Sequence, residues 1–95
     1  MIERHVTFVV LPDKVKEFEQ FFTNEYKPAM SRSAGFNRVD LLVEKAQQSN
    51  YQMVIRFETQ EDSDAWRNSE DHKILSPKLK KLYRTSLMTA YEVVV

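Results

Sequence analysis

Residues 36–57 read FNRVDLLVEKAQQSNYQMVIRF, and this stretch decides the fold. Apolar and polar side chains largely alternate in residues 36–44 and again in 51–57, which is typical of strands that bury one face. The polar run 45–50 between them is short enough for a hairpin loop, so the two strands are expected to pair antiparallel. One face of this hairpin is apolar and carries Val39, Leu41, Val43, Met53, Ile55 and Phe57.

The residues before the hairpin predict a strand followed by an amphipathic helix. A β-rich run, residues 4–11, stops at a Pro-Asp pair, which is a turn or helix-start signal. In residues 13–30 apolar side chains recur every three or four positions, so we expect a helix with a distortion near Pro28. Gly35, the only glycine, then marks a turn whose backbone conformation other residues avoid.

The residues after the hairpin predict a second helix that begins close to residue 60. Thr59 and Asp62 are typical of a capping box, and acidic residues follow the cap where the helix dipole favours them. In a helix that continues to residue 72, Ser69 lies midway between Trp66 and His72, about 60° from each. One broad face of this helix would then carry all three side chains.

A bend and a last strand complete the predicted element order. Ser76 and Pro77 form a strong helix start, so a second helical piece is expected to begin there. The apolar, β-branched run 86–95 predicts a final strand. The resulting βαββαβ order is that of a ferredoxin-like α+β fold, with a four-stranded antiparallel sheet and helices on one face. We expect a single domain over residues 1–95.

The face of the sheet away from the helices is predicted to be mixed in character. The side chains on this face are together too apolar for full exposure to water and too polar for an ordinary core. Two such sheets packed face to face would hide the apolar members and enclose a partly polar cavity for a ligand, so we expect a C2 homodimer, or dimeric α/β barrel. By the same alternation the face carries His5, Thr7, Val9, Arg38, Asp40, Leu42, Gln52, Val54 and Arg56.

The composition indicates which binding partners and which cellular compartment to expect. Lys and Arg number 14, as do Asp and Glu, so no overall charge attracts nucleic acid or acidic membranes. The sequence has no cysteine, which excludes disulfides, thiolate metal sites and cysteine nucleophiles. No apolar run is long enough for a membrane span, and the first residues lack the pattern of a signal peptide. We expect a cytoplasmic protein with no nucleic-acid or membrane partner.

The spacing Trp66-x-x-Ser69-x-x-His72, preceded by a strand that ends Ile55-Arg56-Phe57-Glu58, resembles the antibiotic biosynthesis monooxygenase family of dimeric α+β barrels. The element order and the chain length are similar to those of small members over nearly the whole chain. The resemblance implies a homodimer and a cleft between sheet and helices. It also implies oxygenation of quinols, polycyclic phenols or haem without a conventional prosthetic group, and therefore no bound cofactor.

The haem-degrading branch of that family is a poorer match. It uses an Asn on the first strand, a Trp in the second helix and an axial His about ten residues after this Trp. Trp66 agrees with the pattern, but Ser76 or Pro77 stands at the position of the axial His. The first strand offers His5 and Thr7 in place of the Asn. Haem degradation is therefore disfavoured.

Cofactor-free oxygenation needs a base, donors that hold an anion, and a dry pocket. His72 is expected to be the base that ionises a phenol or quinol, because an imidazole titrates near neutral pH. Trp66 would supply an indole donor and an aromatic wall. No metal site is expected. The substrate-binding candidates, among them two arginines for the oxyanion, are His5, Thr7, Arg38, Arg56 and Ser69.

Structural roles compete with these assignments. Trp66 could simply close its helix over the sheet, His72 could cap a helix, and Arg38 could pair with Asp40 on the same strand face. The favoured function is a cofactor-independent monooxygenase that acts on a planar phenolic or quinol compound. The alternatives are a non-catalytic small-ligand-binding or stress-related dimer of the same fold, and an isomerase or decarboxylase in which His72 moves protons.

Overall fold

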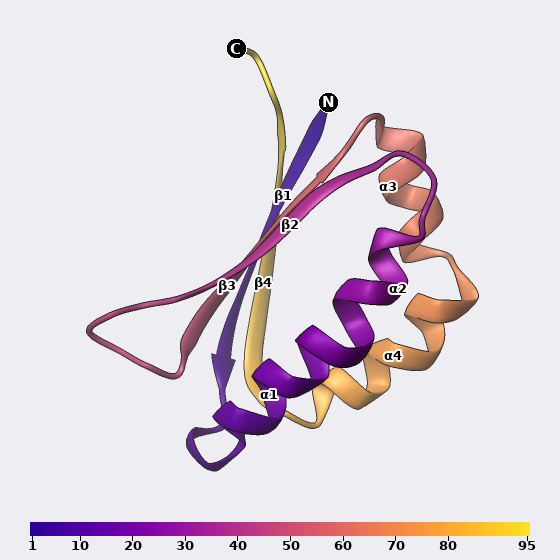
Figure 1. Ribbon diagram of the computed structural model, residues 1–95. Coiled ribbons are helices and arrows are strands. Elements are labelled where there is room, and N and C mark those ends of the chain that lie inside the picture. The colour runs from indigo at the N-terminus through magenta and orange to yellow at the C-terminus, as the bar shows by residue number, and fades with distance from the viewer.

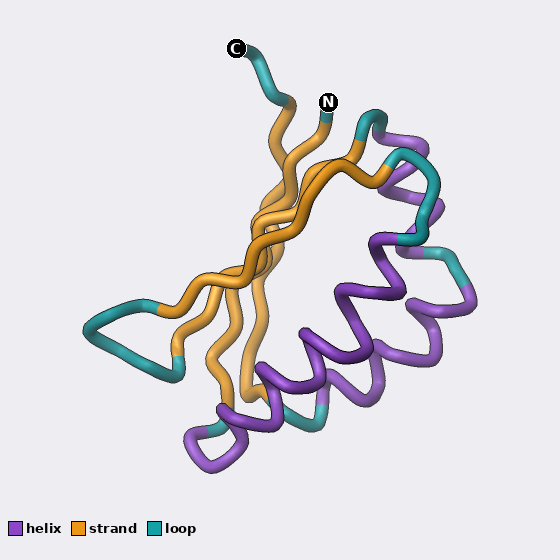
Figure 2. The backbone as a smooth tube through the Cα atoms, viewed as in Figure 1, coloured by secondary structure: helices purple, strands orange, loops and turns teal.

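The computed structural model describes residues 1–95 and contains one four-stranded sheet with all its helices on one side (Figure 1). The strands are β1 (Ile2–Val10), β2 (Phe36–Val43), β3 (Asn50–Phe57) and β4 (Tyr83–Glu92), in the spatial order β2-β3-β1-β4. Every neighbouring pair is antiparallel. The predicted ferredoxin-like α+β fold is confirmed, and Figure 2 shows the helical layer lying against a single strand layer.

The first helical segment contains a local distortion, as the sequence predicts. It runs through a 3-10 turn (Pro12–Lys14), α1 (Val15–Phe21), a π-helical turn (Phe22–Tyr26) and α2 (Lys27–Ser31). Pro28 has no N–H to donate to the preceding turn, and the wider π-helical turn accommodates this loss. Phe18, Phe22, Tyr26 and Ala29 from the predicted apolar stripe are buried.

Gly35 ends the connection from α2 to β2 in the left-handed region, with φ +72°. A Cβ atom at this position would lie 2.0 Å from Oδ2 of Asp62, so a side chain has no room there. The carbonyl of Gly35 also accepts a hydrogen bond from the backbone N–H of Glu58. The expectation that Gly35 takes a conformation other residues avoid is confirmed.

The second helical region breaks at a different place from the one predicted. It consists of α3 (Gln60–Arg67) and α4 (Glu70–Lys80), with Ser69 as the N-cap of α4 and Pro77 inside this helix. The prediction that the bend precedes Ser76 is therefore wrong, and so is a continuous helix to residue 72. Ser69 is the better start because two acidic residues follow it at the positive end of the helix dipole, whereas lysines follow Ser76.

The two faces of the sheet carry the side chains that the alternation predicts. Strand positions on the helix side join a buried core of sixteen residues, which includes Phe8, Val10, Val39, Met53, Ile55 and Phe57. The other face, called here the open face, carries the odd-numbered residues of β1, the even-numbered residues of β3 and, from Arg38 onward, those of β2. Phe36 precedes a shift of the register and packs against the core instead. None of the helices is long and apolar enough to cross a membrane.

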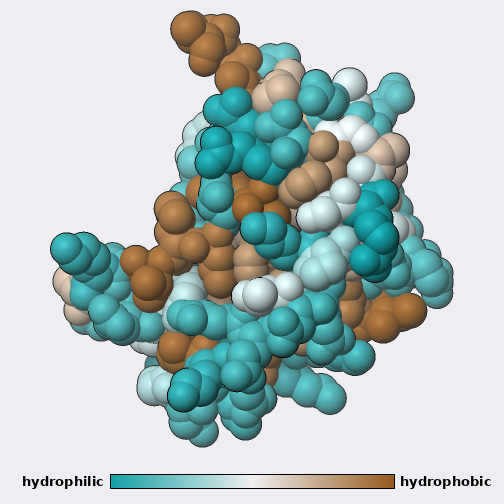
Figure 3. Space-filling view, in the orientation of Figure 1, coloured by the Kyte–Doolittle hydropathy of each residue, from teal (hydrophilic) through white to brown (hydrophobic).

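Strand β4 is an edge strand that the helices leave largely uncovered. It begins three residues earlier and ends three residues earlier than the predicted run 86–95. All its residues except Tyr83 are exposed, including Leu87, Met88 and Tyr91. Apolar side chains also stand clear of the molecule at the C-terminal end, where Val94 and Val95 are exposed (Figure 3).

Candidate active site

Three aromatic rings from separate helical elements meet under the helical layer. Trp66 of α3 is 2% exposed, and its ring centroid lies 5.4 Å from that of His72 on α4, with the two planes at 85°. The ring of Tyr26 lies 5.6 Å from Trp66 and 6.5 Å from His72. We call these three residues the aromatic cluster. The structure thus brings together both residues that the sequence predicts as catalytic.

Ser69 connects the two catalytic candidates through their backbones. Its Oγ accepts a hydrogen bond from the backbone N–H of His72 at 3.1 Å and donates one to the carbonyl of Trp66 at 2.6 Å. The hydroxyl is therefore engaged in holding the turn between α3 and α4. Ser69 was predicted to bind substrate; the structure places it where it positions His72 against Trp66.

The surroundings of His72 favour a neutral imidazole. Partial burial lowers the pKa of His72 below its ordinary value, and the positive charges of Arg4, Arg67 and Lys80 lower it further. A neutral ring at neutral pH can accept a proton, which is the property a general base needs.

Tyr26 has the opposite protonation behaviour. Burial raises the pKa of Tyr26 to about 12, although the charge of Arg4 and a hydrogen bond with Trp66 act in the other direction. Its phenol therefore stays protonated near neutral pH, which leaves His72 as the group of the aromatic cluster that can take up a proton.

A residue that the sequence analysis did not single out, Arg4, lies beside this cluster. Its strand position is even-numbered, like those of Val6 and Phe8, so its side chain lies on the helix side of β1. Arg4 is 8% exposed and its Nε has no hydrogen-bond partner. The alternation of the first strand could have identified it, because a charged residue at an apolar position of a strand requires an explanation.

The other predicted site residues lie on the opposite side of the sheet. His5 and Arg56 both bind Glu3, with His5 Nε2 2.6 Å from Oε2 and Arg56 Nε 2.6 Å from Oε1. Thr7 donates to the carbonyl of Leu87 at 3.3 Å. The expected pair of Arg38 and Asp40 is present on this face as well, at 2.6 Å.

One protomer therefore does not bring His5, Thr7, Arg38 or Arg56 to the aromatic cluster. The sheet separates the two groups, because neighbouring residues of a strand point to opposite faces. Within this chain Arg38 and Arg56 do not reach an oxyanion beside His72, whereas Arg4, like Arg67 of α3, lies on the same side of the sheet as His72.

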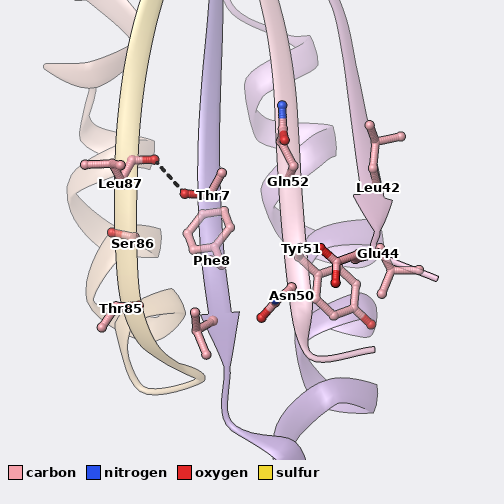
Figure 4. Close-up of a pocket in the computed structure, with 12 residues that line it drawn as sticks. Thr7, Phe8, Leu42, Glu44, Asn50, Tyr51, Gln52, Thr85, Ser86 and Leu87 are labelled. Atoms are coloured by element: carbon pink, nitrogen blue, oxygen red, sulfur yellow. Dashed lines mark hydrogen bonds between the residues drawn. The ribbon is translucent and has the colours of Figure 1, made fainter. Parts of the chain in front are cut away.

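A hollow of about 540 Å³ opens on the open face, near the end of β1. Figure 4 views it with the helices behind the strands, and Thr7, Gln52, Leu42 and Leu87 lie around it. The sequence predicts a cavity on this face, enclosed by two packed sheets. No group of three or more His, Asp or Glu side chains is arranged to hold a metal ion.

Solved structures that resemble this chain share its whole fold. A cofactor-independent oxygenase from Streptomyces nogalater, SnoaB, superposes with a TM-score of 0.90 at 19% identity, over 99% of this chain and 93% of that chain. A candidate antibiotic biosynthesis monooxygenase from Deinococcus radiodurans gives 0.89 at 14% identity, over 100% and 94%. One from Nitrosomonas europaea gives 0.87 at 16% identity, over 100% of both chains.

These structures show the fold of the chain, and its family follows from the sequence. A comparison with curated proteins gives no match. The family model described as antibiotic biosynthesis monooxygenase matches residues 1–75, which include all of the aromatic cluster and Arg4. The chain therefore belongs to the antibiotic biosynthesis monooxygenase family.

Proposed function

We propose that this protein oxidises a planar phenol or hydroquinone with molecular oxygen, without a prosthetic group, and that His72 is the base. The observation that carries the proposal is the half-buried imidazole of His72, held with a lowered pKa against the rings of Trp66 and Tyr26. The membership of the chain in the monooxygenase family and its structural likeness to SnoaB support the same chemistry.

The reaction needs few groups from the protein. His72 takes the proton of the phenol, and the electron-rich phenolate gives one electron to oxygen. The resulting radical pair combines to form a carbon–oxygen bond, and loss of water from the hydroperoxide leaves a quinone. In the balance, a phenol and one O2 give a quinone and one water. The proton held by His72 goes to the outer oxygen of the peroxide. The O–O bond then breaks as the ring carbon gives up its hydrogen, and this proton leaves with the departing oxygen as water.

The aromatic cluster suits this reaction because two of its three rings are buried away from water. Trp66 is buried and Tyr26 is 6% exposed, so their rings can form the wall that a planar substrate stacks against. Exclusion of water protects the phenolate and the hydroperoxide from side reactions. Trp66 and His72 are thus the proposed catalytic pair.

We also propose that the chain acts as a homodimer joined through its open faces. Large apolar side chains are exposed there, with Leu42 at 51% and Leu87 at 70%. A second copy would cover them together with the hollow beside Thr7, and His5, Thr7, Arg38 and Arg56 would then line the interface. Sedimentation of the purified protein tests this, since Leu87→Glu should shift a dimer to a monomer.

Oxygen uptake by the purified protein tests the activity. A panel of naphthohydroquinones and polycyclic phenols would be assayed with wild type, with His72→Ala, and with Lys73→Ala, which changes the neighbouring exposed residue of α4. We expect uptake in wild type and Lys73→Ala and its loss in His72→Ala while circular dichroism stays unchanged. Equal rates in His72→Ala, or no uptake above background with any substrate, would contradict the proposal.

A non-catalytic ligand-binding dimer is the second candidate, and the hollow on the open face favours it. This hollow lies on the other side of the sheet from His72. Tight binding of a planar compound that His72→Ala leaves intact, together with no oxygen uptake, would support this candidate. Turnover under anaerobic conditions would instead indicate an isomerase or a decarboxylase.

A further inference from the structure

Arg4 is a buried cation without a matching anion. It lies in the middle of the sheet, between Ile55 on β3 and Ala90 on β4 in the cross-strand register. Arg4 is only 8% exposed. Its Nε nevertheless has no hydrogen-bond partner, and none of the salt bridges includes it. The adjacent carboxylate, Glu3, lies on the open face and binds His5 and Arg56.

The charges around Arg4 do not compensate it. Arg67 lies close enough to destabilise its charge further, and of nearby carboxylates only Asp64 acts in its favour. Asp64 is exposed, and its Oδ1 accepts a hydrogen bond from Gln60 at 2.9 Å. Burying a guanidinium costs free energy unless an anion pairs with it. The helix side of the sheet therefore holds an excess of positive charge beside the aromatic cluster.

We infer that Arg4 binds the anionic oxygen of an aromatic ligand, a phenolate or a carboxylate, next to Trp66 and His72. The planar guanidinium can hold such an oxygen with two parallel N–H donors. This inference rests on the proposed function, and it specifies the substrate: an aromatic compound that is bound as an anion. In that reaction Arg4 would stabilise the phenolate that His72 generates.

The position of Arg4 also leaves a route for such a ligand. Its neighbour Ala90 and the next residue on the same face of β4, Met88, are both exposed. The helices therefore do not cover the β4 side of this face. A flat aromatic ring can approach over β4 with its charged oxygen directed at Arg4 and its ring toward the aromatic cluster.

Binding of two isosteric probes tests this without any turnover. The affinities of 2-naphthoate and 2-naphthamide would be measured by titration calorimetry at one pH and one salt concentration. The two probes have the same ring, and only the first carries a charge. We expect wild type to prefer 2-naphthoate by on the order of ten- to a hundredfold, as for a hydrogen bond to a charged group. Arg4→Met should reduce this preference to about onefold.

Two further variants make the result specific. Arg84→Met removes an exposed arginine of β4 and should keep the full preference, because Arg84 lies at the surface near the start of the strand. Arg4→Lys keeps the charge but loses the planar fork, so an intermediate preference is expected. It also tests the inference if Arg4→Met does not fold.

A third probe separates the two kinds of anion. The absorbance of bound 1-naphthol reports whether its hydroxyl is ionised. Ionised naphthol on wild type but not on Arg4→Met would identify a phenolate site. Un-ionised naphthol together with a preference for naphthoate would identify a carboxylate site.

The inference would be overturned if wild type bound neither probe, bound both equally, or kept its preference in Arg4→Met or Arg4→Lys unchanged. Failure of the proposed oxygenation is a separate result, because these measurements need no oxygen. A charge preference that depends on Arg4, without oxygen uptake, would leave the anion site standing and remove the oxygenase.

Discussion

Replacement of Ser69 by Ala should destabilise the protein and disturb the geometry of Trp66 and His72. The Oγ of Ser69 makes two hydrogen bonds, one from the N–H of His72 and one to the carbonyl of Trp66. Loss of an N-cap costs about 0.5–2 kcal/mol. Loss of the second, half-buried hydrogen bond adds about 0.5–1.5 kcal/mol. The expected decrease in the free energy of unfolding is therefore about 2 kcal/mol.

This decrease is large for a chain of this size. In a domain of 60–100 residues, about 1 kcal/mol corresponds to a Tm shift of roughly 4–8 °C. Ser69→Ala should therefore lower the Tm by roughly 8–16 °C at a fixed protein concentration. Trp66 is the only tryptophan, so its fluorescence reports the site directly in urea or thermal unfolding.

Two comparisons separate the contributions. Thr59→Ala removes the N-cap of α3, where the hydroxyl accepts from the N–H of Asp62 at 3.1 Å and donates to Oδ2 of the same residue at 2.9 Å. The second hydrogen bond lies at the surface and adds little, so a loss of about 1 kcal/mol is expected. Ser69→Asp keeps a cap acceptor, but an ionised carboxylate cannot donate to the carbonyl of Trp66. Its stability should fall between wild type and Ser69→Ala.

The reasoning would be refuted if Ser69→Ala were no less stable than Thr59→Ala and left the emission spectrum of Trp66 unchanged. That result would mean that the hydroxyl of Ser69 does not hold the turn between α3 and α4.

Three further predictions concern single groups. Burial and nearby positive charges lower the pKa of His72, so kcat/KM for the proposed oxygenation should decline only below pH 6.5. Arg67→Gln removes one of these charges and should move the decline to higher pH. A pH profile that the substitution leaves unchanged contradicts the assignment of His72 as the base. Burial raises the pKa of Tyr26 from its ordinary value of 10 to about 12, so its contribution to stability is complete below pH 10 and is lost as the pH rises through 12. In urea unfolding, Tyr26→Phe should therefore lose less free energy of unfolding at alkaline pH than wild type. An equal loss in the two proteins would refute this. Gly35→Ala should lower the free energy of unfolding by about 2–3 kcal/mol, because alanine disfavours φ +72° and its Cβ would lie 2.0 Å from Oδ2 of Asp62. A decrease below about 0.5 kcal/mol in the same urea assay would show that the turn can relax.

Some features could be predicted because they depend on local patterns. The alternation over residues 38–43 and 51–57 assigns these side chains of the hairpin to a face, and the structure confirms the faces, although Val43 at the end of β2 is 41% exposed. The distortion near Pro28 follows from one missing N–H, and the start of α3 follows from the hydroxyl of Thr59 and the N–H of Asp62. The family resemblance also rests on a short motif, and the match over residues 1–75 confirms it.

The position of the helix break could not be decided in this way. Ser69 and Ser76 both have the local signals of a helix start. The choice depends on the charges that follow each serine and on which leucines can reach the core, where Leu75 and Leu79 are both buried. A local sequence pattern does not show which of the two possible helix starts leads to the better-packed core.

The sequence by itself determined the order of the strands and helical regions, the faces of β1, β2 and β3 that pack under the helices, and the presence of Trp66 and His72 on one helical region, because these follow from periodicity over a few residues. The tertiary structure decided which of the candidate residues share a site. Alternation had already assigned His5, Thr7, Arg38 and Arg56 to the open face. The tertiary structure showed that Trp66 and His72 meet on the other side of the sheet, and it brought Arg4 and Tyr26 to them. Burial and the absence of a counter-charge arise only when segments distant in the chain pack together, and this is why the isolated cation at Arg4 becomes visible only in the folded molecule.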